Sequence, residues 1–200
     1  MIEAHKVRIG VLAIQGDYAA HAAALEANGA EAVEVRKPEQ LAGLDGIVLP
    51  GGESTTVLKF LEKNSFFEAL QSFCLTYPVF GTCAGAILLA KEVLRPAQRS
   101  LGLLDATVER NAYGRQVDST ILTAETRLAG GPLEMVFIRA PRFVQVGEQV
   151  EVLAERDGAP TLVRQGSVLA ATFHPELSPD SRVHRLFVEM AQKAEKPAAG

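Results

Sequence analysis

Apolar residues in the first half of the chain occur in short, nearly unbroken runs separated by longer mixed segments. Runs of this kind are typical of parallel strands that are covered on both faces of a sheet. We predict four such strands, at residues 7–14 (VRIGVLAI), 32–36 (AVEVR), 46–49 (GIVL) and 78–80 (PVF).

The segments between these runs predict helices. Residues 18–28 (YAAHAAALEAN) end at Gly29, residues 55–64 follow Ser54 as the expected N-cap, and residues 66–75 continue helically. Strand and helix therefore alternate with short turns. This alternation predicts a parallel sheet wound by right-handed crossovers.

The second half has a different pattern, because short strand-like segments are separated by turns that contain Gly, Pro or Asp. These segments are residues 103–111, 116–122, 134–141, 150–156, 160–166 and 168–173. We expect them to form a mixed or antiparallel extension of the same sheet. Residues 181–193 predict a closing helix, with Val183, Leu186, Phe187 and Met190 at helical spacing.

Composition and length narrow the class of protein. The chain has 200 residues, of which 48% are hydrophobic and 22% charged, which is sufficient for one packed core. We predict a single α/β domain over residues 1–200, with a mostly parallel sheet and a tail that is disordered after about residue 193. The net charge of −4 and the scattered Lys and Arg residues argue against nucleic acid or an anionic membrane as a partner.

The two cysteines, Cys74 and Cys83, form no C-x-x-C pair and have no metal-ligand spacing with histidine. A pair this sparse fits a reducing compartment. The first apolar run, residues 9–14, is too short for a signal peptide or a membrane span. These features predict a cytoplasmic protein with no membrane anchor and no bound metal.

A cysteine stands at the corner between the fourth predicted strand and the next helix. Residues 81–85 read GTCAG, which has the form of a nucleophile elbow with cysteine in the place of serine. Small neighbours permit a tight, strained turn that lifts Cys83 to a helix N-terminus, where the dipole favours a thiolate. The N–H of Ala84 is placed to hold an oxyanion. Because cores often contain buried cysteines, the corner alone leaves an inert Cys83 equally open.

A candidate base lies near the C-terminus. Residues 168–176 read VLAATFHPE, so His174 follows an apolar strand and Glu176 lies two residues further on. In extended conformation both side chains point to the same side, and Pro175 excludes a helical continuation. A carboxylate beside an imidazole fixes its tautomer and supports the imidazolium. Cys83, His174 and Glu176 are therefore the candidate nucleophile, base and orienting acid.

The other histidines and the second cysteine have weaker claims to a chemical role. His5 lies at the start of the chain, His21 in an Ala-rich helix and His184 in the last helix. We assign all three solvated or structural roles. Cys74 lies within a predicted helix and is expected to be a core residue.

A glycine pair follows the third predicted strand, in Pro50-Gly51-Gly52-Glu53-Ser54. Consecutive glycines allow backbone N–H groups to approach a ligand closely, although Gly-Gly is also common in ordinary loops. The loop leaves the same carboxyl edge of the sheet as the cysteine corner, where open α/β sheets bind ligands. We therefore assign the second oxyanion N–H to Gly52.

Together these motifs resemble a known family. PGGES, GTCAG and FHPE, in this order, are similar to the class I, or triad, glutamine amidotransferases. The longer segments AIQGD (residues 13–17), LGLLDATVERNAYGRQVDS (101–119) and VFIRAP (136–141) resemble the glutaminase subunits of pyridoxal 5′-phosphate synthase. The resemblance covers residues 7–190, and no motif position departs from it.

The resemblance implies a flavodoxin-like three-layer sandwich that hydrolyses L-glutamine to L-glutamate and ammonia through a γ-glutamyl thioester. It carries the triad to Cys83, His174 and Glu176 and implies no cofactor. The residues that it implies bind glutamine are Gly52, Glu53, Ser54, Arg110, Ile138 and Arg139. From the residues alone, a guanidinium suits the α-carboxylate of the substrate, but Arg115 and Arg142 are then as open as Arg110 and Arg139.

A partner is expected from the chemistry of the product. Ammonia released into neutral water becomes ammonium, and the chain has neither a P-loop nor a lysine in a Schiff-base context that would mark a second active site. The resemblance implies a separate (β/α)8-barrel synthase that joins channelled ammonia to a pentose phosphate and a triose phosphate. It also implies a large hetero-oligomer with glutaminases outside a ring-shaped synthase core. Gln15 and Gly16 would belong to the docking and activating region.

Three alternatives stay open at this point. A cysteine hydrolase of similar fold, such as a γ-glutamyl hydrolase or a protease-like relative, would share the elbow but act on larger substrates. A regulatory subunit would keep the fold without the chemistry, although no triad member is missing here. A glutaminase that serves histidine or purine biosynthesis would share the triad but not the longer motifs.

Overall fold

The computed structural model describes residues 6–63, 65–110 and 119–194. The strands formed by these residues are β1 (Arg8–Leu12), β2 (Glu31–Val35), β3 (Gly46–Leu49), β4 (Val79–Thr82), β5 (Ala90–Leu94), β6 (Leu104–Glu109), β7 (Ser119–Ala124), β8 (Leu133–Ile138), β9 (Arg142–Val146), β10 (Glu151–Arg156), β11 (Ala159–Gln165) and β12 (Val168–Ala171). The helices are α1 (Tyr18–Ala27), α2 (Ser54–Leu61), α3 (Phe66–Thr76), α4 (Ala84–Leu89) and α5 (Arg182–Lys193), with 3-10 turns η1 (Pro38–Leu41) and η2 (Pro175–Leu177).

A seven-stranded sheet in the order β10-β11-β12-β4-β3-β1-β2 forms the centre of the molecule. Its strands from β12 to β2 are parallel. At the other edge, β11 pairs antiparallel with β12, and β10 pairs antiparallel with β11. The predicted mostly parallel sheet with a mixed extension is therefore confirmed.

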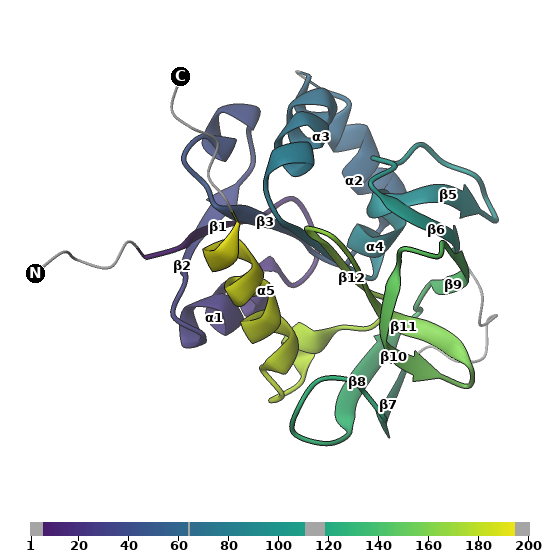
Figure 1. Cartoon of the computed structure of the whole chain (residues 1–200). Helices are drawn as coiled ribbons and strands as arrows, with labels where there is room; N and C mark the ends of the chain where they lie inside the picture. The colour runs from purple at the N-terminus through teal and green to yellow at the C-terminus, as the bar shows by residue number, and fades with distance from the viewer. Residues whose placement is uncertain (1–5, 64, 111–118, 195–200) are drawn as a thin grey trace, which may run out of the picture.

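Helices cover both faces of this sheet, with α1 and α5 on one side and α2, α3 and α4 on the other (Figure 1). Side chains along β3 show the alternation, because Ile47 and Leu49 pack in the cluster that includes α2, α3 and α4. Val48, between them, packs in the cluster that includes α1 and α5. Burial on both faces explains the unbroken apolar runs in the first half of the sequence. The predicted three-layer sandwich is confirmed.

The extension of the central sheet is smaller than the sequence suggested. β10 and β11 join it, but β6 lies in a separate three-stranded sheet with β5 and β9, and β7 pairs with β8 in a two-stranded sheet. Along β6 and β7, more buried and less buried positions alternate. This alternation suits a strand covered on one face, whereas the central sheet is covered on two. Residues 111–118 and most of the predicted disordered tail, 195–200, lie outside the described residues.

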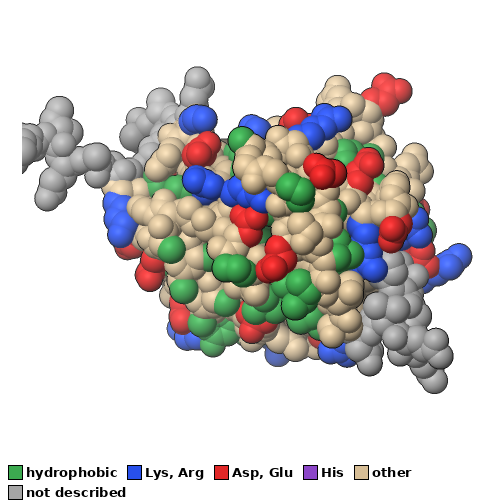
Figure 2. All heavy atoms as spheres, turned by 90° about the horizontal axis from the view of Figure 1, so that it is seen from below, with side chains coloured by type: hydrophobic (Ala, Val, Ile, Leu, Met, Phe, Trp, Pro, Cys, Tyr) green, Lys and Arg blue, Asp and Glu red, His purple; other side chains and the backbone are tan. Residues whose placement is uncertain are grey.

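Within the described ranges, no helix is both long enough and apolar enough to cross a bilayer. Acidic and basic side chains are interspersed on the face shown in Figure 2, between small groups of hydrophobic side chains. Neither sign of charge gathers into one continuous region on that face.

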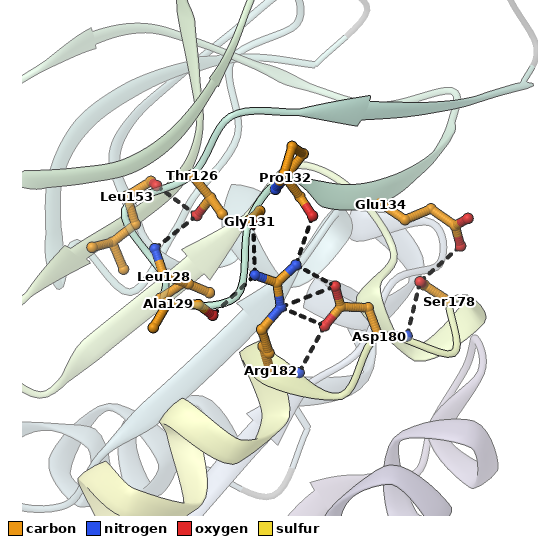
Figure 3. A network of polar contacts seen from close by, with 10 residues as sticks. All are labelled: Thr126, Leu128, Ala129, Gly131, Pro132, Glu134, Leu153, Ser178, Asp180 and Arg182. Atoms are coloured by element: carbon orange, nitrogen blue, oxygen red, sulfur yellow. Dashed lines mark hydrogen bonds and ion pairs between the residues drawn. The ribbon is translucent and has the colours of Figure 1, made fainter.

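Arg182 joins the start of α5 to the turn that precedes β8 (Figure 3). Its guanidinium donates hydrogen bonds to the carbonyl oxygens of Ala129, Gly131 and Pro132 at 2.7–3.1 Å. The same group contacts both carboxylate oxygens of Asp180, and these hydrogen bonds lower the pKa of Asp180. Because carbonyls in a turn have no ladder partners, one side chain here replaces several backbone hydrogen bonds.

We predict that Arg182→Ala lowers the free energy of unfolding by about 2–3 kcal/mol, because it removes charged hydrogen bonds to three carbonyls. Urea denaturation measures this change. Arg185→Ala, an exposed arginine of the same helix, is the matched control and is expected to change stability by less than about 0.5 kcal/mol. Equal losses in the two variants would contradict the role given to Arg182.

Candidate active site

Three neighbouring parallel strands carry the predicted site residues at their carboxyl ends. In the sheet order, β4 lies between β12 and β3. Ala171 pairs with Thr82 across β12 and β4, and Leu49 pairs with Gly81 across β3 and β4. The loops that follow these strands therefore leave one edge of the sheet side by side. They carry His174, Cys83 and the glycine pair.

Cys83 stands on a strained turn. Its φ of 48° and ψ of −102° lie outside the regions that ordinary residues prefer, and its N–H donates to the carbonyl of Ala171 at 2.8 Å. A Cβ on Gly81 would lie 2.6 Å from the backbone of Gly85, and one on Gly85 would overlap the carbonyl oxygen of Leu49. The strained elbow expected from GTCAG is present, and close backbone packing requires both of its glycines.

His174 and Glu176 form a buried pair. His174 Nδ1 lies 2.8 Å from Glu176 Oε1, and the two side chains are 8% and 0% exposed. The expectation of an extended His-Pro-Glu segment is wrong, because residues Pro175–Leu177 form the 3-10 turn η2. Proline suits the first position of such a turn, where its missing N–H costs no hydrogen bond. The turn, rather than an extended strand, brings the carboxylate to the imidazole.

The ionisation of this pair is set by its partners. Burial lowers the pKa of His174, but hydrogen bonds with Cys83 and Glu176 outweigh burial and raise it to about 10. Burial likewise raises the pKa of Glu176, but hydrogen bonds from His174 and His21 hold it well below its usual range. Near neutral pH the pair is therefore imidazolium and carboxylate.

Most of the predicted site residues line one cavity of about 340 Å³. It is lined by Gln15, Gly16, Asp17, Gly51, Gly52, Glu53, Ser54, Cys83, Ile87, Arg110, Ile138, Arg139 and His174. Glu176 and Ala84 lie behind this lining, with Ala84 1% exposed at the start of α4. A larger hollow of about 500 Å³ lies beside β10, and none of the described residues that line it is a histidine or a cysteine.

Glu53, Ser54 and Arg110 form the polar side of the cavity. The predicted N-cap Ser54 is wrong, because the carboxylate of Glu53 caps α2 by accepting from the N–H groups of Thr55 and Thr56 at 3.0 and 2.8 Å. Burial acts to raise the pKa of Glu53, but these bonds lower it to about 2. Arg110 donates to Glu53 at 3.2 Å and to Thr55 at 2.9 Å. Ser54 is buried in the first turn and donates to Gln98 at 2.9 Å.

Ile138 and Arg139 enter the cavity from the end of β8. The carbonyl oxygen of Ile138 lies 4.0 Å from Cys83 Sγ. Arg139 has a φ of 42°, an uncommon value for a residue other than glycine. Of the two other candidate arginines, Arg142 is exposed on β9 and does not line the cavity, whereas Arg115 lies outside the described residues.

The segment of Gln15 and Gly16 packs against the glycine pair. Gln15 Oε1 accepts from the N–H of Glu53 at 3.2 Å. Any side chain at Gly16 would overlap the carbonyl oxygen of Gly51, and a Cβ on Gly51 would lie 2.5 Å from Cε1 of His174. Gly51 therefore provides room for the imidazole, while Gly52 has a φ of 132° that favours glycine.

Two buried histidines, for which the sequence indicated only solvated or structural roles, lie beside this site. His21 and His184 are 0% exposed, and His21 Nε2 lies 3.3 Å from Glu176 Oε2. His21 shares the buried face of α1 with Leu25, one turn further on. This spacing is the one sequence signal for its burial, and it is weak because alanine makes most of α1 apolar.

Two of the three possible metal ligands of this region are already hydrogen-bonded to each other. Within the part of the chain that the structure describes, single atoms of Asp17, His174 and Glu176 lie within 4.8 Å of one another. His174 and Glu176 are hydrogen-bonded to each other, so a metal ion would have to replace that bond. The donor set suits proton transfer better than metal binding.

Comparisons with known proteins agree on one family. The model of the SNO glutamine amidotransferase family matches residues 11–193. The pyridoxal 5′-phosphate synthase subunit PdxT of Koribacter versatilis is 61% identical over 93% of this chain and 96% of its own. The PdxT subunit of Thermotoga maritima is 50% identical over 93% of this chain and 100% of its own. A crystal structure of a glutamine amidotransferase superposes with a TM-score of 0.86 at 50% identity, over 92% of this chain and 98% of that one.

The raised pKa of His174 predicts a pH-dependent contribution to stability. The ordinary value of 6.5 rises to about 10 in the folded chain, so the stabilisation is complete below about pH 6.5 and is lost as pH rises through about 10. The free energy of unfolding of the unmodified chain should therefore exceed that of His174→Gln by more at about pH 6 than at about pH 9.5.

Urea denaturation at both pH values measures this gap. Glutamine does not titrate, so the variant corrects for the titratable groups that His174 does not contact. A gap that stays constant or widens with pH contradicts the imidazolium assignment.

Proposed function

The chain belongs to the SNO glutamine amidotransferase family, and we propose that it is the glutaminase subunit of a pyridoxal 5′-phosphate synthase in vitamin B6 biosynthesis. It hydrolyses L-glutamine to L-glutamate and ammonia. The main support for this proposal is the buried Cys83-His174-Glu176 arrangement beside a cavity of about 340 Å³. The 61% identity to a PdxT subunit supports the assignment to this synthase.

The reaction begins with attack by the Cys83 thiolate on the side-chain amide carbon of glutamine. His174, as the imidazolium, gives its proton to the departing nitrogen, and ammonia leaves a γ-glutamyl thioester on Cys83. Neutral His174 then takes a proton from water, which attacks the thioester carbon. Glutamate leaves, and the thiolate and imidazolium are restored. Glu176 holds the imidazole through Nδ1, which leaves Nε2 for proton transfer.

The oxyanion that forms in both steps is held by the backbone N–H groups of Gly52 and Ala84. Ala84 supports this role as the first residue of α4, directly after Cys83. Gly52 supports it because the Gly51-Gly52 loop and Cys83 line the same cavity. By analogy with other acyl-transfer sites, loss of one such donor costs about 10²–10³ in rate.

Glutamine is bound by Gly52, Glu53, Ser54, Arg110, Ile138 and Arg139, all of which line the cavity. A guanidinium suits the α-carboxylate, and a carboxylate suits the α-ammonium group. Arg110 is held in place by Glu53 and Thr55, so little side-chain entropy is lost when the substrate binds.

A synthase subunit receives the ammonia. We assign it a (β/α)8 barrel in a ring-shaped core with glutaminases bound outside, in which ammonia is joined to a pentose phosphate and a triose phosphate. Gln15 and Gly16 are the proposed docking and activating residues. Support comes from the contact of Gln15 with Glu53 and from the close approach of Gly16 to Gly51. A partner that displaced this segment on binding would therefore also move the Gly51-Gly52 loop.

Cys83→Ala should abolish glutamate release from glutamine, since no nucleophile then remains at the elbow. A coupled glutamate assay on the purified complex measures this. Cys74→Ala is the matched control, because Cys74 is a buried thiol of α3 whose pKa is raised by burial. It should keep activity within about threefold of the unmodified chain. Glutamate release that persists in Cys83→Ala would contradict the nucleophile assignment.

The isolated chain should release glutamate slowly and should accelerate when a barrel synthase subunit is added. The physical reason is that the docking segment touches the oxyanion loop, so binding can complete the site. Titration of the synthase against a fixed amount of this chain measures the effect. Full activity of the isolated chain, unchanged by the synthase, contradicts the partner proposal while leaving the glutaminase proposal standing.

A further inference from the structure

The proposed triad continues inward through a chain of buried polar side chains. His21 on α1 lies between Glu176 and His184, with Nε2 at 3.3 Å from Glu176 Oε2 and Nδ1 at 2.9 Å from His184 Nε2. The hydroxyl of Thr82, the residue before Cys83, lies 3.1 Å from the same Nε2. The two histidines and Thr82 are 0% exposed. Helices α1 and α5 therefore each place an imidazole beneath the site.

Glu176 needs a donor at its second oxygen. Its Oε1 is bonded to His174, whereas Oε2 is buried and has no hydrogen bond of regular geometry among the described residues. A buried ionised carboxylate is costly when one oxygen has no compensation. His21 Nε2 at 3.3 Å supplies this compensation. The length of the contact is explained by the N–H being shared with Thr82 Oγ1.

The contacts select one set of tautomers. A lone pair on His21 Nε2 would face a carboxylate oxygen and repel it, so the proton lies on Nε2. In neutral His21, Nδ1 then accepts, and His184 donates from its own Nε2. His184 Nδ1, which is buried without a partner among the described residues, becomes a bare lone pair. The reverse assignment would leave a buried N–H without an acceptor there, which is the rarer and costlier defect.

We propose that His21 is a positioning residue of the active site: it donates from Nε2 to Glu176 Oε2 and thereby fixes the carboxylate that orients His174, while His184 fixes the tautomer of His21. The inference rests on the proposed function, because it assumes that His174 is the base. His21 touches neither the substrate nor the reacting atoms. Phe80 contacts both imidazoles edge-on, at 6.2 and 5.9 Å between ring centroids, which keeps their surroundings apolar and strengthens the polar contacts.

His184 is held neutral in this arrangement. Burial lowers its pKa to about 3. The titratable groups that face His174 and Glu176 are Cys83, His21 and His184, together with Asp17, whose carboxylate lies within 4.8 Å of both. A change at His21 therefore reaches His174 through Glu176, which is the group between them.

A pair of substitutions separates positioning from packing. In His21→Gln, the amide nitrogen replaces Nε2 and reaches toward Glu176. In His21→Asn, the shorter side chain places its amide oxygen near the position of Nδ1, where it accepts from His184, and no donor reaches Glu176. By analogy with the outer partners of other functional imidazoles, His21→Asn should lower kcat about 10–100-fold with KM changed less than about threefold. His21→Gln should recover most of this loss.

The titration of His174 supplies the second readout. Weaker support of the imidazolium lowers its pKa, so the NMR titration midpoint of His174 and the alkaline limb of the kcat profile should move to lower pH in His21→Asn. Both should stay near the unmodified values in His21→Gln. Leu25→Ala is the control, because Leu25 is fully buried on the same face of α1 and its loss destabilises the chain without touching Glu176.

Different results would overturn the positioning role of His21 and the proposed function. If His21→Asn and His21→Gln behave alike in kcat and in the His174 midpoint, or if Leu25→Ala moves that midpoint as far as His21→Asn, the positioning role is refuted. If the unmodified complex releases no glutamate, the proposed function fails. The NMR titration, which needs no activity, then still decides whether His21 acts on His174 through Glu176.

Discussion

The parallel pairing of β4 with β12 determines where the reactive side chains of this molecule lie. The two strands are far apart in sequence, yet the register that places Ala171 beside Thr82 brings Cys83 and His174 to the same edge of the sheet. The hydrogen bond from Cys83 N–H to the carbonyl of Ala171 extends this pairing to the elbow itself. β3 on the other side of β4 adds the glycine loop. A change of register by one residue would turn each of these side chains to the opposite face.

At this edge of the central sheet the backbone is closely packed and charged side chains are buried. Gly85 lets α4 approach β3, and Gly51 leaves room for the imidazole of His174. The space that remains is small, so the ionised groups near it are largely removed from water. His174 and Glu176 keep each other charged, and His21 contacts the second carboxylate oxygen of Glu176. Arrangements of this kind are stable only when every member has its partner.

Much of this could be predicted from the sequence, for identifiable reasons. The central strands are buried on both faces, so β1 and β3 appear as unbroken apolar runs, and the short motifs around Cys83 and His174 carry strong backbone constraints. β5 and β9 were not predicted, because these five-residue strands are partly exposed and lack a long apolar run. Glu53 was missed as the cap of α2 because its position depends partly on Arg110, which lies 57 residues further along the chain.

His21 could not be identified as a partner of Glu176 from sequence, because its contact joins α1 to η2 across most of the chain and alanine hides the buried face of α1. Chemical trapping tests whether Cys83 is the nucleophile. The chain is treated with a glutamine-like electrophile and, in parallel, with a peptide-like one, and the adducts are mapped by mass spectrometry. We expect modification of Cys83 by the glutamine-like reagent alone, with slower labelling in His174→Gln. Labelling of Cys74 instead, or preference for the peptide-like reagent, would contradict this expectation.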